Sequence, residues 1–143
     1  MLLEEIPLRF KNASSRRELR YSLATPASDS EIMQAEQRLG TLFPQQVKLF
    51  YQHYNGVRID DPPLEILAVN EITYFSSNLL HFATLDGGHH LHFDISKLNA
   101  AEQWDIVTTD GFCVTLTMAS FWSNRMWAWI EKRRPIWHEE RAT

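Results

Sequence analysis

The sequence predicts a single α+β domain, in which an antiparallel sheet of about four to six strands carries helices mainly on one face. Three observations predict this class. Residues 28–56 show the apolar periodicity of two short helices, residues 79–117 contain two β-hairpin patterns, and residues 117–133 form a wide apolar helical stripe. A chain of 143 residues is most simply one domain around one hydrophobic core.

The first predicted helix has a signal at each end. Ser28 and Glu31 stand in the S-x-x-E arrangement, in which each side chain binds the backbone N–H of the other residue. Ile32 and Leu39 belong to an apolar stripe with helical spacing, and Gly40 follows as the residue best able to take a positive φ. We therefore expect a helix from Ser28 to Gly40.

A second helix is expected directly afterwards. Pro44 suits the first helical position, where a missing N–H costs nothing. Val47 and Tyr54 bracket an apolar stripe, and the pair Asn55-Gly56 favours a left-handed exit from the helix.

The two helices also carry a family motif. Its elements are E-x-x-L-G at residues 36–40, then Leu42, Pro44, Phe50 and Asn55-Gly56. This pattern resembles the opening motif of the SUKH superfamily, which contains bacterial immunity proteins and a fungal cell-wall-assembly regulator. The resemblance continues in the family's usual order over roughly residues 25–131, with a strand ending near Asp86-Gly87-Gly88, a strand ending at Asp94, a Trp104-Asp105 strand and an Ala119-Ser120-Phe121 helix. It implies a SUKH-like domain over residues 25–134, an N-terminal extension over 1–24 that packs on it, and a C-terminal tail over 135–143.

The N-terminal extension is less clearly patterned. Glu4 to Phe10 alternates loosely, as a first strand would, and Ser14 to Leu23 fits a short helix or a second strand. Thr25 precedes Pro26 and is pushed out of the α region, which ends the segment.

The predicted sheet consists mainly of two antiparallel hairpins. Leu79–Leu85 and His90–Ile95 flank a glycine-containing connection, and Trp104–Thr109 and Phe112–Thr117 flank the turn dipeptide Asp110-Gly111. In the last strand, Phe112, Val114 and Leu116 are expected to face the helices, while Cys113, Thr115 and Thr117 face water. Cys113, the single cysteine, has no pattern of a nucleophile around it.

An acidic loop precedes these hairpins. The loop Asp60-Asp61-Pro62-Pro63 leads into a short strand at Leu64–Leu67, and Glu71–Ser77 is expected to be a short helix or turn. Asp60, Asp61 and Glu65 form either a solvated loop or an acidic contact patch for a basic partner.

The final helix is expected from about Thr117 to Arg133. Its apolar stripe is typical of a core-facing helix, and consists of Met118, Phe121, Trp122, Met126, Trp129 and Ile130. Trp127 projects from the opposite side, either as a contact residue for a partner or beneath the tail around Trp137.

Histidines form the one cluster with possible chemistry. His90, His92 and Asp94 point the same way on a strand, and His81 could join them from the paired strand. Such ligands can hold zinc or iron, but nothing in the sequence fixes the register, so no metal or cofactor is expected. Phosphate-binding, nucleophile-elbow and zinc-protease motifs are absent from the sequence. We therefore expect no catalytic residues and no enzyme.

Charge and composition restrict the partners. A net charge of −4 argues against direct binding of nucleic acid. The local basic runs are Arg16-Arg17 with Arg20, and Lys132-Arg133-Arg134; the second is interpreted as charges that favour the C-terminus of a helix. No membrane span or secretory signal is visible, so a soluble cytoplasmic protein is expected.

The resemblance implies a binding module, an immunity protein that occludes a cognate toxin of nuclease or deaminase type. An acidic inhibitor suits the basic substrate cleft of a nuclease. The expected partner-binding residues are Asp60, Asp61, Glu65, His90, His92 and Trp127. The alternatives are a metal-dependent enzyme or sensor on the His90/His92/Asp94 strand, and a regulatory protein-interaction domain.

Overall fold

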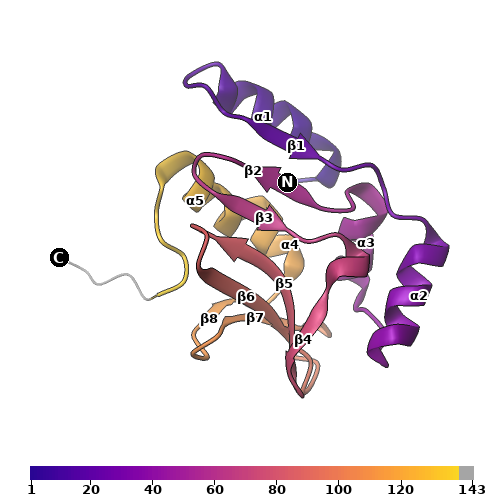
Figure 1. Cartoon of the computed structure of the whole chain (residues 1–143). Helices are drawn as coiled ribbons and strands as arrows, with labels where there is room; N and C mark the ends of the chain where they lie inside the picture. The colour runs from indigo at the N-terminus through magenta and orange to yellow at the C-terminus, as the bar shows by residue number, and fades with distance from the viewer. Residues whose placement is uncertain (139–143) are drawn as a thin grey trace.

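The computed structural model, which describes residues 1–138, has an α+β fold built on one antiparallel sheet (Figure 1). The predicted class is confirmed, although the sheet has eight strands, in the order β1-β2-β3-β5-β6-β7-β8, with β4 paired to β5. The strands are β1 Tyr21–Leu23, β2 Val57–Ile59, β3 Leu64–Ile66, β4 Thr73–Ser76, β5 Leu79–Leu85, β6 His89–Asp94, β7 Asp105–Thr108 and β8 Cys113–Thr115.

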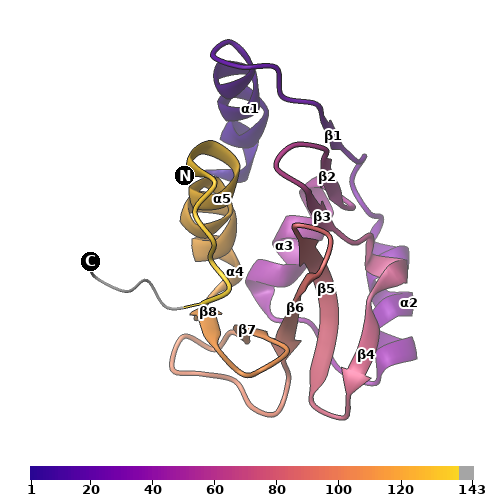
Figure 2. The same ribbon diagram turned by 60° about the vertical axis from the view of Figure 1, so that its left-hand side comes forward.

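The helices lie mainly on one side of this sheet, where α1, α3 and α5 gather in Figure 2. Their bounds are α1 Ile6–Ser14, α2 Asp29–Leu39, α3 Gln45–His53, α4 Met118–Ser120 and α5 Met126–Lys132, with 3-10 turns at Leu3–Glu5 and Val69–Glu71. A π-helical turn at Phe121–Arg125 joins α4 to α5, so that the two form one continuous helix. Over residues 1–138, none of the helices is both long and apolar enough to cross a membrane.

Helix α2 forms as its sequence signals predict. The Ser28 hydroxyl accepts a hydrogen bond from the Glu31 N–H, and the Glu31 carboxylate accepts one from the Ser28 N–H, each at 3.0 Å. Gly40 ends the helix in the left-handed region with φ of 71°. The buried Glu36 carboxylate accepts from the Phe43 N–H at 2.7 Å, which fixes the connection to the next helix.

Helix α3 confirms the helix predicted after Pro44, but its two ends differ from the predicted ones. Pro44 precedes the helix as its N-cap, and the C-cap Tyr54 is extended rather than left-handed. The positive φ comes at Gly56, at 120°, where the chain enters β2. A Cβ atom there would lie 2.9 Å from the Ile66 carbonyl oxygen, so glycine is required by close backbone approach as well as by φ.

The N-terminal segment corrects the prediction of a first strand. It forms helix α1, because Ile6 and Phe10 are four residues apart and both are fully buried. For residues 14–23, a short helix and a second strand were both open. The structure has the end of α1 at Ser14, then coil, and then the short strand β1, which pairs with β2.

Two other short strands differ from the expectation. Strand β2 was not predicted, and β4 lies within the segment where a short helix or turn was expected. Strands of three or four residues are too short for their periodicity to be read reliably. In β8 and its extension, Val114 is buried as expected, but Leu116 is 57% exposed and does not face the helices.

Candidate functional site: the open face of the sheet

The sheet turns its second face away from the core. In β6, Leu91 and Phe93 are buried in the core, so alternation places His90, His92 and Asp94 on the opposite face. The register of neighbouring strands extends this face in two cross-strand rows. One row contains Ser22, Arg58, Glu65, Thr84 and His90, and the other contains Thr73, His81, His92, Val107 and Cys113. We call these two rows, with Phe75, Asp94 and Asp105, the open face.

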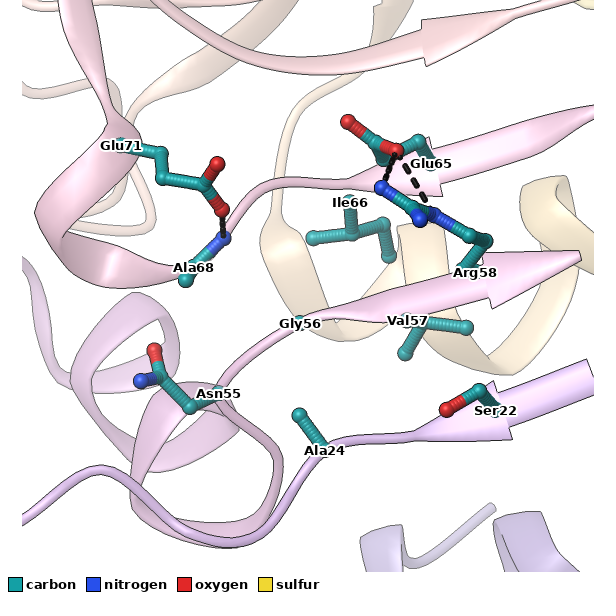
Figure 3. A pocket seen from close by; sticks show the side chains of 10 residues that line it. All are labelled: Ser22, Ala24, Asn55, Gly56, Val57, Arg58, Glu65, Ile66, Ala68 and Glu71. Atoms are coloured by element: carbon teal, nitrogen blue, oxygen red, sulfur yellow. Dashed lines mark hydrogen bonds and ion pairs between the residues drawn. The ribbon is translucent and has the colours of Figure 1, made fainter.

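One end of the open face is hollowed where β1, β2 and β3 meet (Figure 3). The hollow has a volume of about 190 Å³, and Gly56 and Asn55 contribute to its lining. Arg58 and Glu65 reach toward one another across adjacent strands and form an ion pair at 2.5 Å. Asn55 Oδ1 accepts from the Val69 N–H at 2.8 Å, so the Asn55-Gly56 pair fixes the turn beside the hollow.

The centre of the open face holds a hydrogen-bonded group of histidines. His81 Nε2 lies 3.0 Å from the Ala83 carbonyl oxygen, 3.0 Å from Thr84 Oγ1 and 3.1 Å from His90 Nδ1. Because a carbonyl oxygen only accepts, the contact with Ala83 assigns the His81 proton to Nε2. His81 does cross from the paired strand, where its partner in the register is His92.

His92 is fully buried although it belongs to the open face, which corrects its expected exposure. Its Nε2 lies 2.9 Å from Thr109 Oγ1, and the Phe75 ring lies beside it with centroids 4.8 Å apart. Within residues 1–138, its Nδ1 has no hydrogen-bond partner. Burial, followed by the charges of His81 and His90, lowers the pKa of His92 to about 4. The pKa of His81 is lowered by burial and then by His90.

The side chains of His90, His92 and Asp94, which were considered as metal ligands, do not converge on one point. The Asp94 Oδ1 accepts from the Ser96 N–H at 3.0 Å and from its hydroxyl at 2.6 Å, rather than turning toward the histidines. Across the part of the chain that the structure describes, no group of three or more His, Cys, Asp or Glu side chains is placed to hold a metal ion.

Two carboxylates from neighbouring strands lie opposite each other on the open face. Asp94 on β6 is the register partner of Asp105 on β7. Asp105 accepts a hydrogen bond from Asn99 Nδ2 at 2.8 Å. Burial and then the Asp105 charge raise the pKa of the Cys113 thiol, which favours its protonated, unreactive form. Their pairing depends on the register between β6 and β7. The two hairpin turns visible in the sequence do not connect these strands, so they do not determine that register.

The acidic loop is exposed but partly neutralised. Asp60 and Asp61 are exposed, as expected. However, Asp61 pairs with Arg133 at 2.7 Å and Glu65 pairs with Arg58. Ion pairs between exposed side chains reduce the local field, so this loop is a weaker acidic patch than its sequence indicates.

Trp127 is buried, at 1% exposure, and the expectation of an exposed contact residue is wrong. Phe10 of α1 packs on it with ring centroids 4.8 Å apart, and the Arg9 guanidinium lies 4.5 Å above its ring. Its Nε1 donates to the Trp122 carbonyl at 2.7 Å. The reason for the error is α1, since a segment expected as a strand in fact covers the far side of the final helix.

The two most exposed aromatic side chains among residues 1–138 lie instead on β4. Phe75 is 55% exposed and Tyr74 is 46% exposed. Tyr74 is held by a hydrogen bond from its hydroxyl to the Leu39 carbonyl, whereas Phe75 touches the open face at His92. The sequence Thr-Tyr-Phe-Ser at residues 73–76 has high strand propensity, which is the local signal for β4.

Comparison with known proteins agrees with the motif at residues 36–56. No curated protein matches the chain. The model of the SMI1 / KNR4 family (SUKH-1) matches residues 26–123, which is more than half of the sequence and includes β2 to β8. On this match, the chain belongs to the SMI1 / KNR4 family.

Proposed function

We propose that this protein is a non-enzymatic binding protein of the immunity type, which neutralises a cognate toxin domain by covering it with the open face. The observation that carries the proposal is Phe75, a half-exposed aromatic side chain on the open face of a member of this family. Aromatic residues of this kind supply the buried anchors that dominate many protein interfaces.

The surroundings of Phe75 suit a recognition surface. The two cross-strand rows provide hydrogen-bonding side chains that are already held by their neighbours, which reduces the entropy lost on binding. Asp94 and Asp105 add negative charge to the same face, and the protein carries a net charge of −4. A nuclease or deaminase toxin with a basic cleft would be attracted by this field, which speeds association.

The chemistry of the open face supports binding rather than catalysis. His81 and His90 are hydrogen-bonded to each other, His81 also to Thr84, and His92 to Thr109, while the Cys113 thiol has a raised pKa. A general base needs an accessible acceptor near neutral pH, and the fully buried His92, with its pKa lowered to about 4, does not expose one.

This surface revises the expected contact set. Glu65 and His90 stay in it, Asp60 and Asp61 lie at its margin, and Phe75, Asp94 and Asp105 join it. His92 and Trp127 are too buried to touch a partner directly.

The test examines the genes beside this one for a toxin gene, and expresses the encoded toxin with and without the protein. Protection of the cells and tight binding to the toxin's C-terminal domain are expected. Phe75→Ala should speed dissociation at least about tenfold, as truncation of a hot spot does. Asp94→Asn with Asp105→Asn removes both charges but leaves one acceptor oxygen at each position, and should slow association and flatten its dependence on salt.

Leu42→Ala is the matched control, because Leu42 is 80% exposed in the connection between α2 and α3 and does not belong to the open face. Its kinetics should equal those of the unchanged protein. Absence of both protection and binding would refute the immunity role. Protection that survives the open-face substitutions would instead move the interface to another surface.

A further inference from the structure

Two basic runs that are far apart in the sequence meet in the fold. Arg16 and Arg17 follow the end of α1, and Lys132 is the last residue of α5. The helices α1 and α5 lie beside each other on the helical side of the sheet (Figure 2). Between them is a groove with a volume of about 420 Å³, lined by Arg9, Asn12, Ala13, Arg16, Arg17, Glu131 and Lys132. We call it the α1–α5 groove.

The α1–α5 groove is strongly positive in an acidic protein. Four cationic side chains and one carboxylate line it, which leaves a formal charge of +3 against −4 for the whole chain. Arg9 and Glu131 neutralise each other in a two-point contact, at 2.6 Å and 3.3 Å. The unbalanced charge therefore belongs to Arg16, Arg17 and Lys132.

Capping of the helix ends accounts for only one of these three cations. The Arg17 guanidinium donates to the Ile130 carbonyl near the end of α5. Backbone N–H groups of the residues that follow α5 satisfy the carbonyls of Ala128 and Trp129, at 3.0 Å and 2.9 Å. Within residues 1–138, the exposed side chains of Arg16 and Lys132 have no hydrogen-bond or ion-pair partner. Like charges that line one groove repel each other, and an anion between them would relieve this repulsion.

We propose that the α1–α5 groove binds an anion that carries at least two phosphate groups. The planar guanidinium of Arg16 and the remaining N–H donors of Arg17 match the geometry of phosphate oxygens, and Lys132 adds a mobile point charge. The Asn12 side chain lines the same groove and offers an amide donor. A volume of about 420 Å³ falls within the range of about 300–1,000 Å³ typical of small-molecule sites.

This chemistry has two sources, a soluble diphosphate such as that of a nucleotide and the phosphorylated headgroup of a lipid. In either case, the groove lies on the helical side of the sheet and shares no residue with the open face. Its ligand is therefore independent of the proposed toxin-binding role, and failure of one proposal leaves the other unaffected.

The test is isothermal titration of the full chain with inorganic pyrophosphate at constant ionic strength. Binding of one pyrophosphate per chain is expected. Arg16→Gln with Lys132→Gln should weaken it at least about tenfold, because two charge-assisted contacts are lost. Arg16→Lys with Lys132→Arg keeps both charges and should restore most of the affinity. The controls Arg20→Gln and Lys97→Gln remove charge outside the groove and should change the affinity less than about twofold.

Titrations with sulfate and citrate, and sedimentation with vesicles that contain a phosphorylated inositol lipid, complete the experiment. Binding of vesicles but not pyrophosphate, sensitive to the double substitution, would identify the lipid source. Equal affinity for citrate and pyrophosphate would show general charge screening and would overturn the proposal. So would unchanged binding in the double variant, or no binding of either pyrophosphate or vesicles. Both replaced residues are exposed and lose only like-charge repulsion, so the unfolding midpoint should not fall and the variants remain comparable.

Discussion

The two faces of the sheet use burial in different ways. On the helical face, residues such as Leu91 and Phe93 are buried by side chains of the core. On the open face, His90 is exposed while His92, two residues along the same strand, is fully buried by Phe75 and neighbouring strands. Alternation along a strand therefore determines the face on which a side chain lies, but the side chains of adjacent strands determine how exposed it is.

Replacement of Trp127, which is buried on the helical side of the sheet, should give the largest loss of folding free energy. Trp127→Ala removes a fully buried indole, its ring contact with Phe10 and its cover by Arg9, and is expected to cost about 3–5 kcal/mol. Chemical denaturation at neutral pH measures the change. The paired control is Phe75→Ala on the open face, which should cost less than about 1 kcal/mol because its ring is already half exposed. Equal losses would contradict the contrast between the faces.

Gly56 tests the junction between the helices and the sheet. Gly56→Val is expected to destabilise by about 2–3 kcal/mol, since a β-branched residue would combine a positive φ with a 2.9 Å approach to the Ile66 carbonyl. Gly40→Ala provides the comparison, because its φ is 71° but no heavy atom lies within 4 Å of the added Cβ. That change should cost only about 1 kcal/mol, the strain of the backbone alone. If the two losses are the same, the close approach at Gly56 has no energetic role.

His92 should make stability depend on pH. Its folded pKa of about 4 lies below its unfolded value of 6.5, so the fold favours the neutral form. The stabilisation is complete above pH 6.5 and is lost as the pH falls through 4, because the unfolded state binds the extra proton. For one proton the slope is at most about 1.4 kcal/mol per pH unit, and solvent near the exposed His90 reduces it.

Denaturation from pH 4 to 7 in the unchanged protein and in His92→Gln measures this slope. The variant should show a flatter profile in that window, since the titrating group is gone. A slope that His92→Gln leaves untouched would assign the pH dependence to other residues.

Local signals in the sequence were sufficient for the elements that define the fold. The box at Ser28 and Glu31, the glycine at position 40 and the turn at Asp110-Gly111 act within a few residues, and the helices and hairpins follow from them. The contacts of the candidate site depend on longer range. Burial of Trp127 requires α1, which lies more than a hundred residues earlier in the chain.

The open face shows the same division between local and distant information. Alternation predicted correctly that His90 and Asp94 share a side of β6. The opposition of Asp94 and Asp105 and the cover of His92 by Phe75 depend on register and on β4, neither of which is encoded in one short segment. The groove between α1 and α5 likewise arises only when the chain ends meet, although each basic run was visible separately.

The smallest expected effect is at His90, and it sharpens the comparison with its buried neighbour. His90→Ala removes the 3.1 Å contact with His81, but His81 Nε2 keeps the Ala83 carbonyl and the Thr84 hydroxyl as partners. Since the His90 side chain is exposed, the loss should not exceed about 0.5 kcal/mol. His92→Ala leaves a cavity at a fully buried position, and should cost at least about 1 kcal/mol at pH 7. Denaturation midpoints of the two single variants and the double variant, measured together, decide between independent side chains and a cooperative group. If His90→Ala costs as much as His92→Ala, the histidines stabilise the open face as one hydrogen-bonded unit, and exposure does not predict the energy of its members.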